Sequence, residues 1–305
     1  MASCSFLLYI VFLFNNHFWK VVVVSQLSKI KETLKNMDRR AKKGLGQHFL
    51  VDSSYLETIS AKAELSKEDI VIEVGPGLGV LTEVLLEEVG SVIAVEVDTA
   101  LTNALAQALS KSSNLTMVNA DILKTTPEQL LGAGVTSYKV VANLPYNIAS
   151  PVLRRFLESQ LKPSLIVVMV QREVAKNMLA KPPDMNLLAI GVQLYGRPKI
   201  VRKVPSDAFY PKPKVESAIV RIDVYNEPAV AVGDIETFFR IARAGFGNKR
   251  KQLRNSLAHG LDVSPITIEQ LLSRAGIDYQ RRAQTLTLEE WACLSNLYGG
   301  KHDNH

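Results

Sequence analysis

The chain has 305 residues, of which 47% are hydrophobic and 22% charged, so it is long enough for one α/β domain and a smaller companion domain. Cys4 and Cys293 lie far apart without paired spacing, which argues against a disulfide framework or a zinc site and favours a reducing compartment. Of the formal net charge of +6, residues 1–36 hold half, so net charge alone decides little about nucleic-acid binding.

The first 36 residues differ in character from the rest. Phe6–Phe14 is an apolar run too short to span a bilayer, and polar residues within 15–20 interrupt any longer version. The run lacks the basic start of a signal peptide, and no arginine precedes Arg39, which disfavours an organelle transit peptide. We expect residues 1–36 to be an extension outside the folded core, with the biological protein beginning at Met37. A membrane-anchored form is the alternative.

A glycine-rich turn follows the first predicted strand. Asp69–Val74 has the β-branched composition of a buried strand, and Leu78–Glu88 has leucines at helical spacing. The sequence Glu-Val-Gly-Pro-Gly-Leu-Gly of Glu73–Gly79 joins them, and such glycines, Gly75 and Gly77 among them, let backbone approach a ligand closely. The third glycine arrives one residue too early for the dinucleotide fingerprint G-x-G-x-x-G. This spacing and the acidic start fit a methyltransferase better than a dehydrogenase, with a generic nucleotide turn as the alternative.

The next two predicted strands also end in acidic residues. Ser91–Val97 contains Glu96, which lies where doubly wound sheets place an acid that accepts hydrogen bonds from ribose hydroxyls. Leu115–Val118 leads to Asp121, which could accept from the adenine amino group of S-adenosylmethionine (SAM). Because open parallel sheets bind ligands at the carboxyl ends of their strands, the order favours a SAM site. The alternative is that both acids are ordinary helix N-caps.

The fourth predicted strand, Tyr138–Ala142, runs into the sequence Asn-Leu-Pro-Tyr at Asn143–Tyr146. An exocyclic adenine amine is a poor nucleophile, so an enzyme has to hold its N–H groups with acceptors, for which the Asn143 side chain and the Leu144 carbonyl are suited. Pro145 fixes φ and brings no competing N–H, and Tyr146 offers a ring face for stacking. Since SAM is a charged sulfonium donor, positioning and electrostatics are sufficient and no metal is expected. An Asn-Pro turn with a core tyrosine is the alternative.

The strand and helix rhythm predicts two domains. Strand-like and helical stretches alternate from about Leu56 to Val220, which indicates a mostly parallel sheet covered on both faces. Tyr225–Ala229 has the composition of a linker. After it come helical patterns without strand signals, at 235–244, 249–259, 268–275 and 288–297. We therefore expect a Rossmann-like α/β domain over 37–224 and a small all-helical domain over 230–300.

Basic residues gather in three places rather than evenly. These are Arg39–Lys43, the segment Arg197–Arg221, and Lys249–Lys251 with Arg254. Each could be only a solvated face. If they converge on one side of the fold, they form a phosphate-binding surface that positions RNA without reading its sequence.

With these motifs in place, the chain resembles the ribosomal RNA adenine N6,N6-dimethyltransferase family. The resemblance covers about Arg39 to Leu297 and is carried by four segments besides the two motifs: Gly44–Leu50, Val170–Val174, Val204–Ser217 and Phe246–Leu257. It implies a class I SAM-dependent methyltransferase that dimethylates N6 of two adjacent adenosines in the 3′-terminal hairpin of small-subunit (16S) rRNA. It further implies 30S subunits as partner, ribosome biogenesis as context, a cytoplasmic location and no membrane. We expect a monomer.

The resemblance also assigns residues to roles. It implies SAM contacts for His48, Leu50, Gly75, Gly77, Glu96, Asp121 and Asn143, and target-base contacts for Asn143, Leu144, Pro145 and Tyr146. It implies that Phe209 closes on the other face of the base, whereas the sequence alone favours a core aromatic there. The family often has Asn at the place of His48, and imidazole can also donate a hydrogen bond. The stretch Lys181–Leu188 departs from the Gly- and Tyr-containing loop usual in the family.

Other function classes compete with this one. A large-subunit resistance methyltransferase and a DNA adenine methyltransferase share the fold, although the helical tail with Asn248–Lys251 disfavours the DNA enzymes. A non-catalytic ribosome-assembly or transcription factor could keep the fold and the RNA surface. The presence of Glu96, Asp121 and the Asn143–Tyr146 motif together disfavours that reading.

Overall fold

The computed structural model describes residues 27–28, 30–32, 35, 48–248 and 250–300. The described residues divide into two compact units. The first holds those up to Val152 together with Ser159–Arg172 and Ile200–Arg221. The second holds Leu153–Glu158, Glu173–Lys199 and those from Ile222 on. The expected boundaries at 37–224 and 230–300 stay predictions, and Phe6–Phe14 and Met37 lie outside the described residues.

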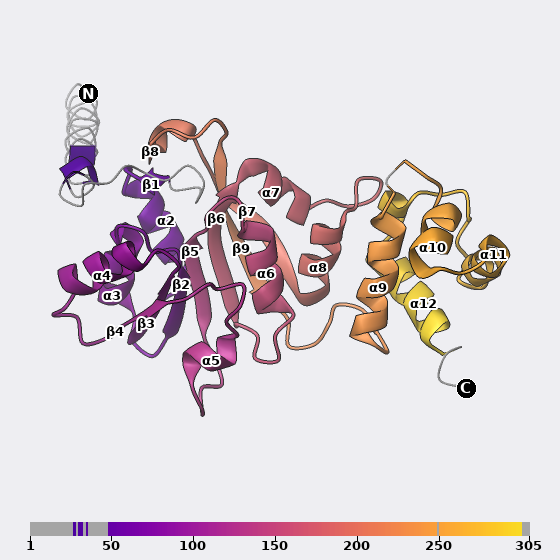
Figure 1. Cartoon of the computed structure of the whole chain (residues 1–305), viewed down its shortest axis with the longest axis horizontal. Coiled ribbons are helices and arrows are strands. Elements are labelled where there is room, and N and C mark those ends of the chain that lie inside the picture. Colours follow the sequence, from indigo (N-terminus) through magenta and orange to yellow (C-terminus); the bar gives the residue numbers. More distant parts are fainter. Residues whose placement is uncertain (1–26, 29, 33–34, 36–47, 249, 301–305) are drawn as a thin grey trace, which may run out of the picture. The chain divides into compact units, whose positions relative to one another are not determined.

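Among the described residues, seven strands form one sheet, whose arrangement can be followed in Figure 1. Their order is β4-β3-β2-β5-β6-β9-β7, and the β2–β3, β3–β4, β2–β5 and β5–β6 ladders are parallel. The bounds are β2 Ile70–Val74, β3 Ser91–Glu96, β4 Leu115–Asn119, β5 Lys139–Asn143, β6 Leu165–Gln171, β7 Gly196–Val204 and β9 Ser217–Val224. A separate two-stranded ribbon pairs β1 (Phe49–Leu50) with β8 (Phe209–Tyr210) antiparallel. The mostly parallel α/β sheet predicted from the sequence is confirmed.

Helices follow most strands, as the alternating pattern predicts. The helices before the C-terminal region are α2 Ser54–Ala63, α3 Val80–Glu88, α4 Thr99–Ala108, α5 Pro127–Leu131, α6 Ala149–Leu157, α7 Arg172–Met178 and α8 Leu187–Tyr195, with the 3₁₀ turn η2 at Ser206–Ala208. Local side chains set several starts: Asp98 caps α4, and Thr126 forms a capping box with Gln129 at α5. In the stretch that departs from the family pattern, Asn186 caps α8 through the amide of Ala189.

The central strands are buried because helices cover the sheet. Alternate residues of the strands share one face: Val71 of β2, Val92 and Ala94 of β3, and Val141 of β5 lie in one apolar cluster. Leu56 and Ile59 of α2 and Leu81 and Leu85 of α3 pack into the same cluster. Burial of parallel strands on both faces explains their near-continuous Val and Ile content.

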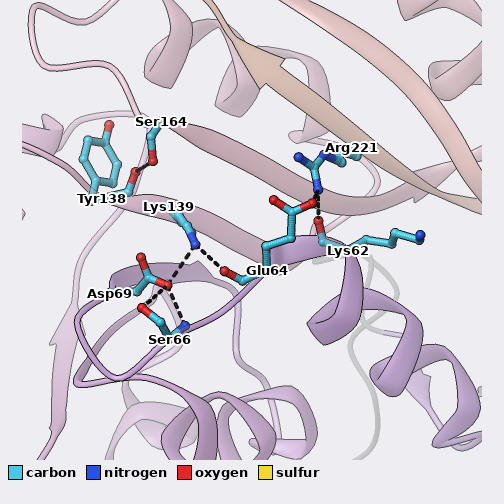
Figure 2. A network of polar contacts seen from close by, with 8 residues as sticks. All are labelled: Lys62, Glu64, Ser66, Asp69, Tyr138, Lys139, Ser164 and Arg221. Atoms are coloured by element: carbon cyan, nitrogen blue, oxygen red, sulfur yellow. Dashed lines mark hydrogen bonds and ion pairs between the residues drawn. The ribbon is translucent and has the colours of Figure 1, made fainter.

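A polar network joins the amino ends of β2 and β5, at the edge opposite to their carboxyl ends (Figure 2). The Lys139 ammonium donates to Asp69 Oδ2 at 2.8 Å and to the Glu64 carbonyl at 2.6 Å. Asp69 also accepts from the amide and hydroxyl of Ser66. Arg221 of β9 donates to the Lys62 carbonyl and pairs with the Glu64 carboxylate. The network therefore fixes the segment between α2 and β2 to β5 and β9.

The C-terminal helices pack on one another, and all lie in the second unit. Their bounds are α9 Ile235–Phe246, α10 Leu253–Leu261, α11 Pro265–Arg274, η3 Ala283–Thr285 and α12 Leu288–Gly299. The four helices predicted from the sequence are present. The predicted helix at 249–259 begins later, at Leu253, because Gln252 before it has an extended backbone. Trp291 of α12 is 1% exposed and its ring lies 5.5 Å from that of Phe246.

We predict that Gly245→Ala lowers the free energy of unfolding by about 1–3 kcal/mol, measured by denaturant titration. A methyl group at Gly245 would lie 2.4 Å from Cη2 of Trp291, whose buried ring has no room to move. Gly299→Ala in α12 is the matched control, because nothing lies within 4 Å of its added methyl group. The control is expected to be neutral or to stabilise the protein by up to about 1 kcal/mol. Equal losses in both variants would contradict the packing argument.

Candidate functional site

A cavity of about 280 Å³ lies at the carboxyl ends of β2, β3, β4 and β5 in the first unit. Parallel α/β sheets bind ligands at this edge. Ten of the predicted site residues line the cavity: His48, Leu50, Gly75, Gly77, Glu96, Asp121, Asn143, Leu144, Pro145 and Tyr146. The structure therefore brings together residues that lie up to 98 positions apart in the sequence, while the role of each one stays a prediction.

The glycine turn lines the cavity with main chain rather than side chains. Gly75, Gly77 and Gly79 have φ values of +68°, +59° and +81°, which residues with a Cβ rarely adopt. A Cβ on Gly75 would lie 3.1 Å from Pro145, and one on Gly77 would lie 3.1 Å from the Phe49 ring. Glycine is thus required both by the backbone conformation and by the close approach of two other cavity-lining residues. The turn therefore presents main chain to the cavity.

Glu96 is 7% exposed, and its carboxylate is held by main-chain donors. The amide of Asp98 donates to Oε1 at 3.0 Å, and the amide of Gly77 donates to Oε2 at 3.3 Å. Burial raises the pKa of the Glu96 carboxyl, and these two hydrogen bonds oppose the rise. The N-cap of the following helix is Asp98, not Glu96. Each carboxylate oxygen keeps a second lone pair, so Glu96 can still accept from a ligand hydroxyl.

Asp121 has a local structural contact as well as a place on the cavity wall. Its Oδ1 accepts from the amide of Leu123 at 3.0 Å, and its Oδ2 lies 3.9 Å from the Lys124 ammonium. The side chain is 37% exposed. This loop turn explains why an aspartate suits the position, and it leaves Oδ2 available to a ligand amine.

Asn143 ends β5 with one side of its amide occupied. Its Nδ2 donates to the His48 carbonyl at 3.4 Å, which directs the amide relative to the chain before β1. Among the described residues, its Oδ1 has no hydrogen-bond donor. Leu144 is buried, and its amide donates to the Met169 carbonyl at 3.1 Å, so the backbone of the motif is fixed to β6. These contacts present acceptor oxygens from a rigid strand end.

His48 has more contacts than the sequence predicts. Its ring stacks on that of Tyr146 with centroids 5.3 Å apart, and its Nδ1 donates to the Pro211 carbonyl at 2.7 Å. The Tyr146 hydroxyl shares a 2.6 Å hydrogen bond with Ser217, and burial raises its pKa. One face of the Tyr146 ring is therefore covered by His48, so a base stacking on Tyr146 would use the other face.

Phe209 is placed beside the site rather than on the cavity wall. It is buried in the apolar cluster that contains Val71 and Val141, and it pairs with Leu50 across the β1–β8 ribbon. That position matches the core role that the sequence alone favours. Its implied role in closing on the target base stays a prediction.

Glu73 opens the glycine motif in the sequence, and in the structure it is a buried acid. It is 1% exposed, lines the cavity and accepts a 2.7 Å hydrogen bond from the Thr82 hydroxyl. Burial raises the pKa of Glu73 to about 8; the Thr82 hydrogen bond opposes the rise and the charge of Glu96 adds to it. The signal in the sequence is an acid inside an otherwise apolar strand.

The basic clusters differ in how they are used. Arg39–Lys43 lies outside the described residues. Within 197–221, Arg202 donates to the Ser54 carbonyl and Thr58 and stacks on Tyr55, and Arg221 pairs with Glu64, so both have structural partners. Convergence of the clusters on one RNA surface stays a prediction.

The described residues contain neither a membrane-spanning helix nor a metal-binding cluster. In the part of the chain that the structure covers, no helix is both long enough and apolar enough to cross a bilayer. Within those same ranges, no group of three or more His, Cys, Asp or Glu side chains is arranged to hold a metal ion. The expectation that catalysis uses no metal stays a prediction.

Comparison with known proteins agrees with the site. The family model described as ribosomal RNA adenine dimethylase matches residues 38–296. Ribosomal RNA small subunit methyltransferase A of Dehalococcoides mccartyi strain BAV1 is 52% identical over 277 residues, covering 90% of this chain and 94% of the relative. The protein of that description from Alkaliphilus oremlandii is 38% identical over 278 residues, covering 90% and 97%.

Solved structures give the same fold. The 23S rRNA methyltransferase ErmE has a TM-score of 0.62 and 26% identity, covering 82% of this chain and 98% of that one. A dimethyladenosine transferase from Plasmodium falciparum has a TM-score of 0.68 and 23% identity, covering 84% and 98%.

The sheet order, the glycine turn and the cavity at the strand ends define a Rossmann-like, class I SAM-dependent methyltransferase. Within that class, the chain belongs to the ribosomal RNA adenine dimethylase family. It is therefore a transferase that methylates adenines of ribosomal RNA.

Proposed function

We propose that the protein dimethylates N6 of two adjacent adenosines in the 3′-terminal hairpin of small-subunit (16S) rRNA, acting as a monomer on 30S subunits in the cytoplasm during ribosome biogenesis. One observation carries the proposal: the Asn143–Tyr146 motif borders the same cavity as the glycine turn and Glu96. Relatives 38–52% identical that are named for the small subunit support the choice of substrate.

The cofactor side of the cavity is assigned to SAM. Its residues are His48, Leu50, Gly75, Gly77, Glu96, Asp121 and Asn143. Glu96 would accept from ribose hydroxyls and Asp121 from the adenine amine, while Gly75 and Gly77 line the cavity with main chain. These side chains include carboxylates, which accept hydrogen bonds and carry negative charge, and an amide. They suit a nucleoside that carries a positive charge.

The target base is assigned to Asn143, Leu144, Pro145 and Tyr146, with Phe209 near its other face. Oδ1 of Asn143 and the Leu144 carbonyl would accept the two N–H groups of adenine N6, which favours the tetrahedral geometry that nitrogen needs to react. When bound, SAM supplies a methyl group carried on a sulfonium. As N6 of adenine forms its bond to the methyl carbon, the electrons of the S–C bond stay on sulfur. The proton that N6 loses goes to water. The residues of the chain contribute orientation and electrostatic stabilisation.

The test is methyl transfer from labelled SAM to 30S subunits that lack the 3′-terminal adenosine methylations, followed by nucleoside mass analysis. We expect N6,N6-dimethyladenosine at two adjacent positions. Transfer to large-subunit RNA instead would move the assignment toward the activity named for ErmE, which is 26% identical. Transfer to neither RNA would favour a non-catalytic assembly factor.

A further inference from the structure

A short segment before Met37 packs against the wall of the cavity. Ile30 is 2% exposed and lies in an apolar cluster with Phe49 and Val51. Leu27, Leu78 and Tyr210 are partly buried against the same cluster. Residues 1–36 were expected to lie outside the folded core. The burial of Ile30 shows instead that this part of the segment packs against the fold.

The cluster reaches the cavity through two residues that line it, Phe49 and Leu78. Cε1 of Phe49 lies 3.1 Å from the place that a Cβ on Gly77 would occupy, so the ring is in contact with the glycine turn. Behind it, β1 pairs Phe49 with Tyr210, and the Lys31 ammonium lies 5.3 Å from the centre of the Tyr210 ring. The apolar cluster that contains Ile30 therefore reaches the glycine turn through Phe49.

The match to a relative extends a few residues beyond Met37 toward the N-terminus. Residues 37–305 make up about 88% of the chain, whereas the alignment with the Dehalococcoides relative covers 90% of it. The alignment therefore has to include positions before Met37.

We propose that Ile30 is a positioning residue for cofactor binding: it holds the Phe49 ring against the glycine turn, so that Gly77 and Leu78 keep the arrangement that accepts SAM. The inference rests on the proposed assignment of this cavity to SAM. Physically, truncating Ile30 leaves a void beside Phe49, and a ring that loses contacts on one side gains freedom to move away from Gly77. The effect is on affinity for the cofactor rather than on the chemistry at adenine.

The test compares three variants of the full chain: Ile30→Ala, Ile30→Val and Glu32→Ala. Affinity for SAM is measured by isothermal titration calorimetry, and amide hydrogen exchange is followed without ligand. We expect the dissociation constant to rise about tenfold in Ile30→Ala and about twofold in Ile30→Val. Glu32, an exposed residue of the same segment, is the matched control and is expected to bind like wild type.

A positioning role also makes a local prediction. Exchange should become faster at 48–51 and 75–79 in Ile30→Ala and stay unchanged in β6, whereas a general loss of stability would speed it throughout the first unit. Unchanged affinity in both Ile30 variants would overturn the proposal, as would faster exchange spread evenly. If Ile30→Ala does not fold, an unchanged dissociation constant in Ile30→Val overturns it. Failure of wild type to bind SAM would instead contradict the assigned cofactor, and the exchange experiment would still test the packing.

Discussion

Asn143→Ala should lower the rate constant for methyl transfer by about 10²–10³-fold, the effect typical of removing one preorganised hydrogen-bonding group at a reacting centre. The variant loses Oδ1, the proposed acceptor for adenine N6, and also the Nδ2 contact that joins the motif to the His48 carbonyl. Binding of RNA should be largely unchanged, because phosphate contacts made elsewhere supply most of the affinity. Single-turnover transfer to undermethylated 30S subunits measures the rate, and a filter-binding titration measures the affinity.

The matched control is Asn103→Ala on α4. Asn103 is exposed, does not line the cavity, and loses the same amide group on substitution. We expect its transfer rate to be within about twofold of wild type, since surface substitutions rarely have larger effects. Loss of RNA binding in Asn143→Ala, or equal losses of rate in both variants, would count against the assigned role.

The sequence was sufficient to predict that the residues after successive strands converge on one cavity. Each proposed contact follows a strand-like run, and parallel strands share one carboxyl edge, so Gly75, Glu96, Asp121 and Asn143 had to lie near one another once the sheet order held. The glycine spacing also predicted a turn between the first strand and helix, and the structure has positive φ values at its glycines. These inferences needed only local patterns and a rule of sheet geometry.

Contacts across long sequence distances were not predictable in this way. The β1–β8 ribbon joins Leu50 to Phe209, and its two-residue strands are too short for periodicity to indicate a strand. The stacking of His48 on Tyr146 follows from that ribbon, since Pro211 accepts from His48. Burial of Ile30 likewise depends on a surface made by Phe49 and Val51. The sequence of 27–35 alone has no pattern that predicts this burial.

Glu73→Gln should remove a large pH dependence of stability. The ordinary pKa of a glutamate is 4.5, and burial raises that of Glu73 to about 8. Between these two pH values the folded protein keeps a proton that the unfolded chain has lost. The contribution of Glu73 to stability is therefore fully present below about pH 4.5 and is lost as the pH rises through about 8. Above that pH, the free energy of unfolding no longer changes through this group. At about 1.4 kcal/mol per pKa unit, the whole change is on the order of 4–5 kcal/mol.

The measurement is the free energy of unfolding by urea at a series of pH values from 4.5 to 9. A glutamine at position 73 cannot ionise, and it can still accept a hydrogen bond from Thr82. From pH 4.5 to 9 the free energy of unfolding of the variant should therefore fall by about 4 kcal/mol less than that of wild type. Glu88→Gln is the control, because Glu88 is exposed at the end of α3, and its pH profile should follow that of wild type. Parallel curves for wild type and Glu73→Gln would mean that the Glu73 carboxyl ionises in the folded protein as it does in the unfolded chain. In that case the strand end beside the glycine turn would hold a second carboxylate next to Glu96, and the cavity would be more strongly suited to a cationic ligand.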